Sequence, residues 1–244
     1  MTDSLILSAQ HTPARKTPSG PPVVLIHGFA SRGAADWPAE QWAQPLSAAG
    51  RDVVVIDLPG HGDSPAPGAA LPTGAVLAAL ADAVRAAVGD AEIDLVGYSL
   101  GARLAWDLAG TSAVPVRRLV LGGISPVEPF GAVDVAAARA AADGGPAPAD
   151  PLTGMILAMA RQSGDPRALL DVVAGLGAEP FDPAVSPPRV PTLLLAGADD
   201  QMMQGIDALA AAIPGARLEH VPGDHFGALR SPELREAVRE FLAE

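Results

Sequence analysis

The sequence predicts an α/β fold in which helices cover both faces of a mostly parallel sheet. Two observations carry this prediction: short apolar, β-branched runs recur along the 244 residues, and Ala- and Leu-rich stretches of helical length separate them. Strands buried on both faces read as continuous apolar runs, and intervening helices imply parallel pairing through right-handed crossovers. At this length we expect one α/β domain with an insertion.

Each element of this fold has its own sequence signal, taken in chain order. The apolar runs predict strands at residues 23–26, 53–56, 93–96, 119–121, 192–195 and 218–221. The helical patterns predict helices at residues 37–49, 74–88, 100–109, 206–213 and 232–243. His220 falls inside the last strand-like run, which predicts a buried, hydrogen-bonded side chain.

Residues 125–188 interrupt the alternation of strands and helices. This segment has no strand-like run, and its Ala-rich helical pieces are separated by Pro and Gly. Met155 and Met159 fall on one apolar helical face within it. We expect a helical cap inserted into an α/β core made of residues 1–124 and 189–244. The alternative is that these helices are ordinary crossovers covering the sheet.

Composition excludes several classes of function. A net charge of -12 without a cluster of Lys and Arg argues against a nucleic-acid partner. The absence of cysteine excludes disulfides, thiolate catalysis and thiolate metal sites. The apolar run at residues 5–7 is too short for a signal peptide, and no run approaches a membrane span. We expect a cytoplasmic globular protein without a membrane partner; no oligomeric state is predicted.

The pentapeptide Gly97-Tyr98-Ser99-Leu100-Gly101 is the strongest chemical signal in the chain. It joins a predicted strand to a predicted helix, so Ser99 lies at the apex of a sharp turn that holds its hydroxyl outward. Gly97 and Gly101 relieve the crowding that this strained backbone creates. Ser99 is therefore the candidate nucleophile.

A serine nucleophile needs a base, usually histidine, and a third group that orients the base. His225 lies in the loop after the last predicted strand, and Asp199 and Asp200 lie in the loop after strand 192–195. Loops at the carboxyl ends of parallel strands can converge on one site. The sequence thus supplies a serine, an aspartate and a histidine in that chain order.

A candidate oxyanion hole comes from His27-Gly28-Phe29, which directly follows the predicted strand 23–26. The glycine leaves the backbone free to aim an N–H group at the serine. The backbone N–H groups of Phe29 and Leu100 are the predicted donors to a developing oxyanion. His27 is expected to shape this loop rather than to act as the base.

Taken together, these motifs resemble the α/β-hydrolase fold family over residues 23–242. The matching segments are residues 27–29, 57–64, 97–101, 197–200 and 223–225. The resemblance implies hydrolysis of esters, thioesters, amides or carbon–carbon bonds without a cofactor. Family members usually carry the acid three residues after a glycine, which points from Gly197 to Asp200, with Asp199 as the fallback. No spacing of His, Asp and Glu indicates a metal site.

The expected activity is hydrolysis of a small, uncharged carboxylic ester through an acyl-enzyme formed on Ser99. A cap that is apolar and poor in charge motivates this choice of substrate. Arg103, one helical turn after Ser99, faces either the rim of the site or a buried carboxylate. The residues expected to line the substrate pocket are Met155, Met159, Phe226 and Arg103.

Two other functions stay open from the sequence. Residues 97–101 with Arg103, together with residues 58–62, are similar to the menaquinone-pathway synthase branch, which eliminates pyruvate from an anionic intermediate. That branch should present basic residues in its cap, and this cap contains no Trp. The basic residues available here are Arg139, Arg161 and Arg167. The other alternative is a non-catalytic protein that binds a small molecule on the same fold.

Overall fold

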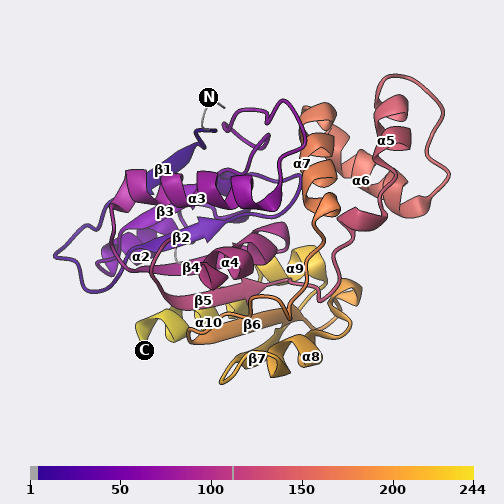
Figure 1. The fold of residues 1–244 in the computed structure, drawn as a ribbon. Coiled ribbons are helices and arrows are strands. Elements are labelled where there is room, and N and C mark those ends of the chain that lie inside the picture. Colours follow the sequence, from indigo (N-terminus) through magenta and orange to yellow (C-terminus); the bar gives the residue numbers. More distant parts are fainter. Residues whose placement is uncertain (1–4, 112) are drawn as a thin grey trace.

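The computed structural model describes residues 5–111 and 113–244. Within them, one sheet has the strand order β1-β3-β2-β4-β5-β6-β7 (Figure 1). All neighbouring strands are parallel except β1, which is antiparallel to β3. The strands are β1 (Ala9–Thr12), β2 (Val23–Ile26), β3 (Val53–Ile56), β4 (Ile93–Tyr98), β5 (Val116–Gly122), β6 (Thr192–Gly197) and β7 (Arg217–Val221). The predicted fold class is confirmed.

The six predicted strands are present, and the sequence missed β1. This strand lies at one edge of the sheet, is mostly exposed and reads Ala-Gln-His-Thr, so it has no apolar run to detect. The prediction for His220 was wrong for a related reason. It lies on β7, the opposite edge strand, and its side chain is exposed.

Helices connect and cover these strands. Those of the core are α1 (Gly33–Asp36), α2 (Ala43–Ala48), α3 (Thr73–Val88), α4 (Leu100–Gly110), α8 (Ile206–Ala211), α9 (His225–Arg230) and α10 (Pro232–Ala243). The single helix predicted at 37–49 is wrong, because Pro38 lacks the N–H that would continue α1 and disfavours a helical Trp37. The short α9 was not predicted.

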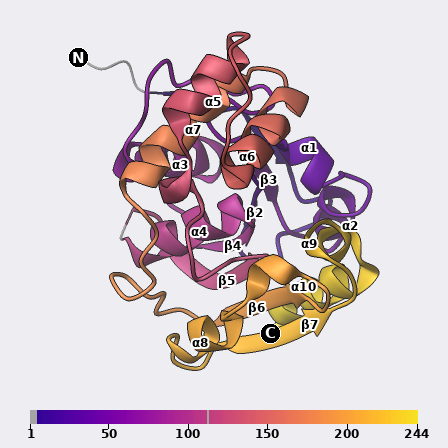
Figure 2. The same ribbon diagram turned by 90° about the vertical axis from the view of Figure 1, so that its right-hand side faces the viewer.

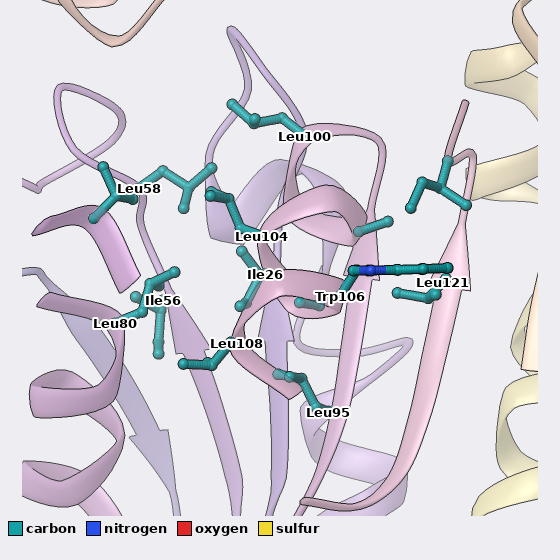
Figure 3. Packing of buried hydrophobic residues seen from close by; sticks show 14 of the residues in the cluster. Ile26, Ile56, Leu58, Leu80, Leu95, Leu100, Leu104, Trp106, Leu108 and Leu121 are labelled. Carbon is teal, nitrogen blue, oxygen red and sulfur yellow. The ribbon is translucent and has the colours of Figure 1, made fainter. Parts of the chain in front are cut away.

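Both faces of the sheet are covered, which explains the continuous apolar runs. Val24 and Ile26 of β2 pack in the same core as α3, α4 and α8, whereas Val23 and Leu25 pack in the core that contains α2, α9 and α10. All four side chains are fully buried. Figure 3 shows the first of these cores, where leucines of α3 and α4 meet the side chains of the central strands.

Residues 125–188, here called the cap, contain a short 3₁₀ turn η1 (Phe130–Ala132) and the helices α5 (Val135–Ala142), α6 (Pro151–Gln162) and α7 (Pro166–Ala178). Each helix begins at an aspartate whose side chain accepts backbone N–H groups, at Asp134, Asp150 and Asp165. The cap helices stand together at one end of the sheet (Figures 1 and 2). They also enclose a small apolar cluster of their own. The domain boundaries at residues 125 and 188 stay a prediction.

No helix in the described part of the chain combines the length and the hydropathy required to cross a membrane.

A buried ion cluster fastens the C-terminal helix to the sheet. Asp94 on β4 is fully buried and pairs with Arg51 and with Arg117, whose Nε and Nη2 both donate to the carboxylate at 2.8 Å. Arg117 Nη2 also donates to the carbonyl oxygen of Leu242 in α10, at 2.8 Å. One carboxylate therefore organises two strands and the end of α10.

Replacing Asp94 tests how much this cluster contributes. We expect Asp94→Asn to lower the free energy of unfolding by about 3 kcal/mol, because it leaves two guanidinium groups without their buried counter-charge. The exposed pair Asp82–Arg85 is the matched control, and Asp82→Asn should cost less than about 1 kcal/mol. Urea unfolding of both variants measures this. Equal losses would contradict the prediction.

Candidate active site

The turn between β4 and α4 holds Ser99 in a conformation that few L-residues adopt. Its φ is 53° and its ψ is -116°. A Cβ on Gly101 would lie 2.2 Å from the carbonyl oxygen of Ile26, and a Cβ on Gly97 would lie 2.3 Å from that of Gly101. Both glycines are therefore required by the close approach of α4 to β2 and β4. Leu100 is the first residue of α4, and the first N–H groups of a helix have no intrahelical acceptor.

A continuous series of hydrogen bonds joins Ser99, His225 and Asp200. His225 Nε2 lies 3.1 Å from Ser99 Oγ, and His225 Nδ1 lies 2.6 Å from Asp200 Oδ2. Because a carboxylate only accepts, Nδ1 carries the hydrogen and Nε2 is left to accept from the hydroxyl. Asp200 also accepts from the Met202 N–H at 2.9 Å, whereas Asp199 is exposed. Of the two candidate acids, the geometry selects Asp200.

His225 is the first residue of α9, not part of a loop as the sequence suggested. Its main chain is held by Tyr98, whose hydroxyl donates to the His225 carbonyl oxygen at 2.6 Å. Burial is the main reason that the pKa of Tyr98 is raised, so the phenol keeps its proton. Tyr98 is thus a supporting residue that the sequence reasoning missed, although it stands beside Ser99 in the pentapeptide.

His27 orients the peptide bond between Gly28 and Phe29. Its Nδ1 donates to the Gly28 carbonyl oxygen at 2.7 Å, and its Nε2 accepts from the Leu58 N–H at 3.0 Å. In a trans peptide the C=O and N–H groups point in opposite directions, so the Phe29 N–H points away from His27. A Cβ on Gly28 would lie 3.4 Å from Ser99 Cβ, so this loop rests against the serine.

A second histidine supports the same loop. His61 Nε2 accepts from the Ala30 N–H at 3.1 Å, and its Nδ1 donates to the Pro59 carbonyl oxygen at 2.8 Å. Burial lowers the pKa of both His27 and His61 from 6.5 to about 4, so both rings are neutral at pH 7. The expectation that His27 shapes the loop agrees with these bonds.

Asp36 completes the support of the loop and was not anticipated from the sequence. Its Oδ2 accepts the Gly28 N–H at 2.8 Å, and its Oδ1 accepts from the Ser31 hydroxyl. Burial is the largest cause of its raised pKa. The side chain lines the cavity above Ser99. Gly28 is therefore held through both its N–H, by Asp36, and its C=O, by His27.

A cavity of about 650 Å³ opens above Ser99, between the core and the cap. It brings together the four residues predicted to line the pocket and the residues of the serine site. The residues that line it include Ser99, His225, Phe29, Leu100, Arg103, Phe226, Met155 and Met159. Phe130 and Ile156 of the cap also line it, and both are almost fully buried. Within residues 5–111 and 113–244, no group of three His, Asp or Glu side chains is placed to hold a metal ion.

Arg103 lines this cavity but is not free. Its Nη1 pairs with the carboxylate of Glu128, and its Nη2 donates to the carbonyl oxygens of Glu179 at 2.7 Å and Leu176 at 3.4 Å. The two sequence alternatives for Arg103 therefore hold together, because it lines the active-site cavity and also pairs with a buried carboxylate. The cap leaves the core near Glu128 and returns to it after α7, so Arg103 ties both ends of the cap to α4.

The fold and the site define a class of protein. At the carboxyl edge of a doubly covered parallel sheet, a serine at a strained strand-to-helix turn contacts a histidine, which in turn contacts an aspartate, as in hydrolases that use a serine nucleophile. The sequence profile of the alpha/beta hydrolase fold matches residues 21–143. The chain belongs to the α/β-hydrolase fold family.

Individual relatives agree with this family. A stretch of 106 residues is 41% identical to the pimeloyl-[acyl-carrier protein] methyl ester esterase of Aromatoleum aromaticum, and the match covers 43% of this chain and 38% of that protein. A hydrolase from Pseudomonas aeruginosa superposes with a TM-score of 0.77 at 24% identity, over 100% of this chain and 97% of the other. The enol-lactonase of Burkholderia xenovorans superposes with a TM-score of 0.74 at 22% identity, over 98% and 96%. These two superpositions establish a shared fold.

The close approach at Gly101 can be tested by adding one methyl group. We expect Gly101→Ala to lower the unfolding free energy by about 2 kcal/mol and activity by about 100-fold, because α4 must move away from β2. Gly154, inside α6 with open space around it, is the matched control. Gly154→Ala should raise stability by about 0.5 to 1 kcal/mol. Wild-type behaviour of Gly101→Ala in thermal unfolding and ester hydrolysis would refute the close approach.

The two neutral histidines predict a loss of stability in acid. Their folded-state pKa of about 4 lies below the unfolded value of 6.5, so their contribution is complete above pH 6.5 and is lost as pH falls toward 4. By linkage, each should remove about 2 kcal/mol between about pH 7.5 and about pH 5. Urea unfolding at both pH values measures this. His27→Gln, whose amide can replace both hydrogen bonds, should show a smaller loss than wild type; identical losses would argue against a neutral, buried His27.

Proposed function

We propose that this protein is a cofactor-free serine hydrolase that cleaves small, uncharged carboxylic esters. The observation that carries the proposal is the hydrogen-bonded series from Ser99 Oγ through His225 to Asp200 at the base of an apolar cavity. Ser99 is the nucleophile, His225 the general base and acid, and Asp200 the group that orients the imidazole. The N–H groups of Phe29 and Leu100 form the oxyanion hole.

In the first half of the reaction, Ser99 Oγ attacks the acyl carbon of the ester while its proton passes to His225 Nε2. The carbonyl oxygen becomes an oxyanion and accepts hydrogen bonds from the Phe29 and Leu100 N–H groups. When the tetrahedral intermediate collapses, the bond to the alcohol oxygen breaks and His225 returns the proton to the leaving alcohol. The product of this half is an acyl-enzyme on Ser99.

In the second half, water takes the place of the alcohol. His225 Nε2 accepts a proton from water as the water oxygen bonds to the acyl carbon, and the same oxyanion hole holds the new tetrahedral intermediate. The intermediate expels Ser99 Oγ, which regains its proton from His225. The carboxylic acid leaves, and the enzyme returns to its starting state.

The lining of the cavity supports an uncharged substrate. Aliphatic, aromatic and thioether side chains form most of its wall, and the volume of about 650 Å³ suits a small organic molecule. The charge of Arg103 is matched by Glu128. The curated relative is named for cleavage of a methyl ester. From that relative we carry over only the ester bond, because the match spans 38% of its length.

The two alternative functions are less well supported. Pyruvate elimination from an anionic substrate would need cations in the cavity. Two arginines line it: Arg103, which pairs with Glu128, and Arg230, which is exposed to solvent. The three cap arginines are all engaged elsewhere. Arg139 pairs with Asp171, Arg167 pairs with Asp143, and Arg161 donates to a backbone carbonyl. None of these three arginines is among the residues that line the cavity. A non-catalytic binder has no need of the hydrogen-bonded serine, histidine and aspartate.

A labelling experiment with an ester panel tests the proposal. A fluorophosphonate probe should label the wild type, and Ser99→Ala should lose both the label and at least about 10⁴-fold of the ester-hydrolysis rate. Ser163→Ala is the matched control, because Ser163 caps the end of α6 outside the cavity, and it should keep both. Persistent labelling of Ser99→Ala would refute the nucleophile. A folded, unlabelled wild type without turnover of any neutral ester would favour the binder.

A further inference from the structure

A buried ion pair forms part of one wall of the active-site cavity. Arg103 and Glu128 both line the cavity, and the side chain of each is only 5% exposed. Arg103 lies one helical turn after the nucleophile, and its backbone N–H donates to the Ser99 carbonyl oxygen at 3.1 Å. The pair therefore lies within reach of a substrate that is bound at Ser99.

Each partner of this pair is held in place. Glu128 Oε1 accepts the Phe130 N–H at 3.0 Å, which leaves Oε2 for Arg103 Nη1. Arg103 Nη2 donates to Leu176 and Glu179, at the C-terminal end of α7, where a cation is stabilised by the unpaired carbonyl groups. Backbone carbonyl groups therefore bind Nη2, whereas Nη1 has Glu128 as its partner.

A second carboxylate lies on the other side of Arg103. Asp107 Oδ2 is 3.9 Å from Arg103 Nε, and Asp107 is not among the residues that line the cavity. Its pKa is raised to about 6, mainly by burial; Arg103 opposes this shift and the charge of Glu128 adds to it. Removing Glu128 would therefore leave Asp107 beside Nε and leave Nη1, the nitrogen that pairs with Glu128 in the cavity wall, without a carboxylate partner.

We propose that Glu128 determines the charge selectivity of the active site. By neutralising Arg103 and presenting its own carboxylate to the cavity, it admits neutral acyl chains and excludes chains that end in a carboxylate. At this wall of the cavity, a substrate carboxylate would have to displace Glu128 from Arg103 or be buried beside Glu128, and both are costly. Arg230, the other arginine of the lining, is exposed to solvent and does not neutralise a charge buried at this wall. Without Glu128, Arg103 would offer a donor group suited to a carboxylate. This inference rests on the proposed ester hydrolysis.

The cap contains two other arginine–aspartate ion pairs, and both lie outside the cavity. Arg139–Asp171 and Arg167–Asp143 have the same chemistry and connect cap helices to one another or to the loop between them. Neither pair lines the cavity. A pair with a purely structural role in the cap is therefore available as a reference for the experiment.

The test compares two ester series of graded and matched length: methyl esters of unbranched monocarboxylic acids, and monomethyl esters of dicarboxylic acids. The measured quantity is the ratio of kcat/KM for the acid-bearing ester to that for the neutral ester. We expect this ratio to be low in the wild type and to rise at least about tenfold in Glu128→Gln. A rise of this size corresponds to about one charge-assisted hydrogen bond between Arg103 and the substrate carboxylate. Because both values come from one preparation, the ratio does not depend on the fraction of folded enzyme.

Three further variants separate selectivity from structure. Glu128→Asp keeps the carboxylate and should keep the low ratio, and Asp171→Asn, which frees Arg139 outside the cavity, should leave it unchanged. Arg103→Met/Glu128→Met removes both charges, and buried pairs often tolerate such replacement, so it should also keep a low ratio while remaining folded.

The outcomes distinguish this inference from the proposed function. If the wild type hydrolyses no neutral ester, the proposed function fails. If it hydrolyses neutral esters but takes acid-bearing esters equally well, or if Glu128→Gln leaves the ratio unchanged, Glu128 does not set the charge selectivity. Should Glu128→Gln yield no active enzyme, Glu128→Ala makes the same comparison, because it also removes the carboxylate and keeps Arg103, and its ratio should likewise rise.

Discussion

The contact between the start of α4 and the end of β2 is the constraint on which the rest of the site depends. At Gly101 the helix backbone approaches the Ile26 carbonyl so closely that a Cβ would lie 2.2 Å from it. This contact forces Ser99 into its positive-φ conformation, which costs of order 1–3 kcal/mol. It also brings the first N–H of α4 next to the loop that follows β2. The parallel neighbours on both sides of β4 and the buried face of α4 offset that strain.

Hydrogen bonds to the backbone then fix what the close approach brings together. His27 and Asp36 hold the C=O and N–H of Gly28, His61 holds the next turn of the same loop, and Tyr98 holds the main chain of His225. These side chains act on peptide groups rather than on a substrate. Burial keeps His27 and His61 neutral and Tyr98 protonated near neutral pH, so the hydrogen bonds of these three side chains are set before any substrate enters.

The sequence was informative wherever burial on both faces or a strained turn leaves a local pattern. That applies to the five inner strands β2 to β6, to Ser99 with its glycines, and to His225 in the region after β7. It was uninformative at the edges of the sheet, where β1 and His220 are exposed and no apolar run marks them. Selecting Asp200 over Asp199 needed the family resemblance, and then the burial of Asp200 against the exposure of Asp199. Glu128 has no sequence signal at all, because a single acidic residue in a Pro-rich connection reads as solvated surface.

Chemistry and selectivity are therefore placed in different parts of the chain. The groups proposed to make and break bonds stand at the carboxyl ends of β2, β4, β6 and β7, which the sheet holds in a fixed register. The cap supplies 11 of the 27 residues that line the cavity, and its helices have a small core of their own. Arg103 is the residue where the two meet, since it extends from the nucleophile's helix and binds both ends of the cap. A change in the charge around Arg103 would thus alter the substrate that reaches Ser99 while leaving the hydrogen bonds of Ser99, His225 and Asp200 in place.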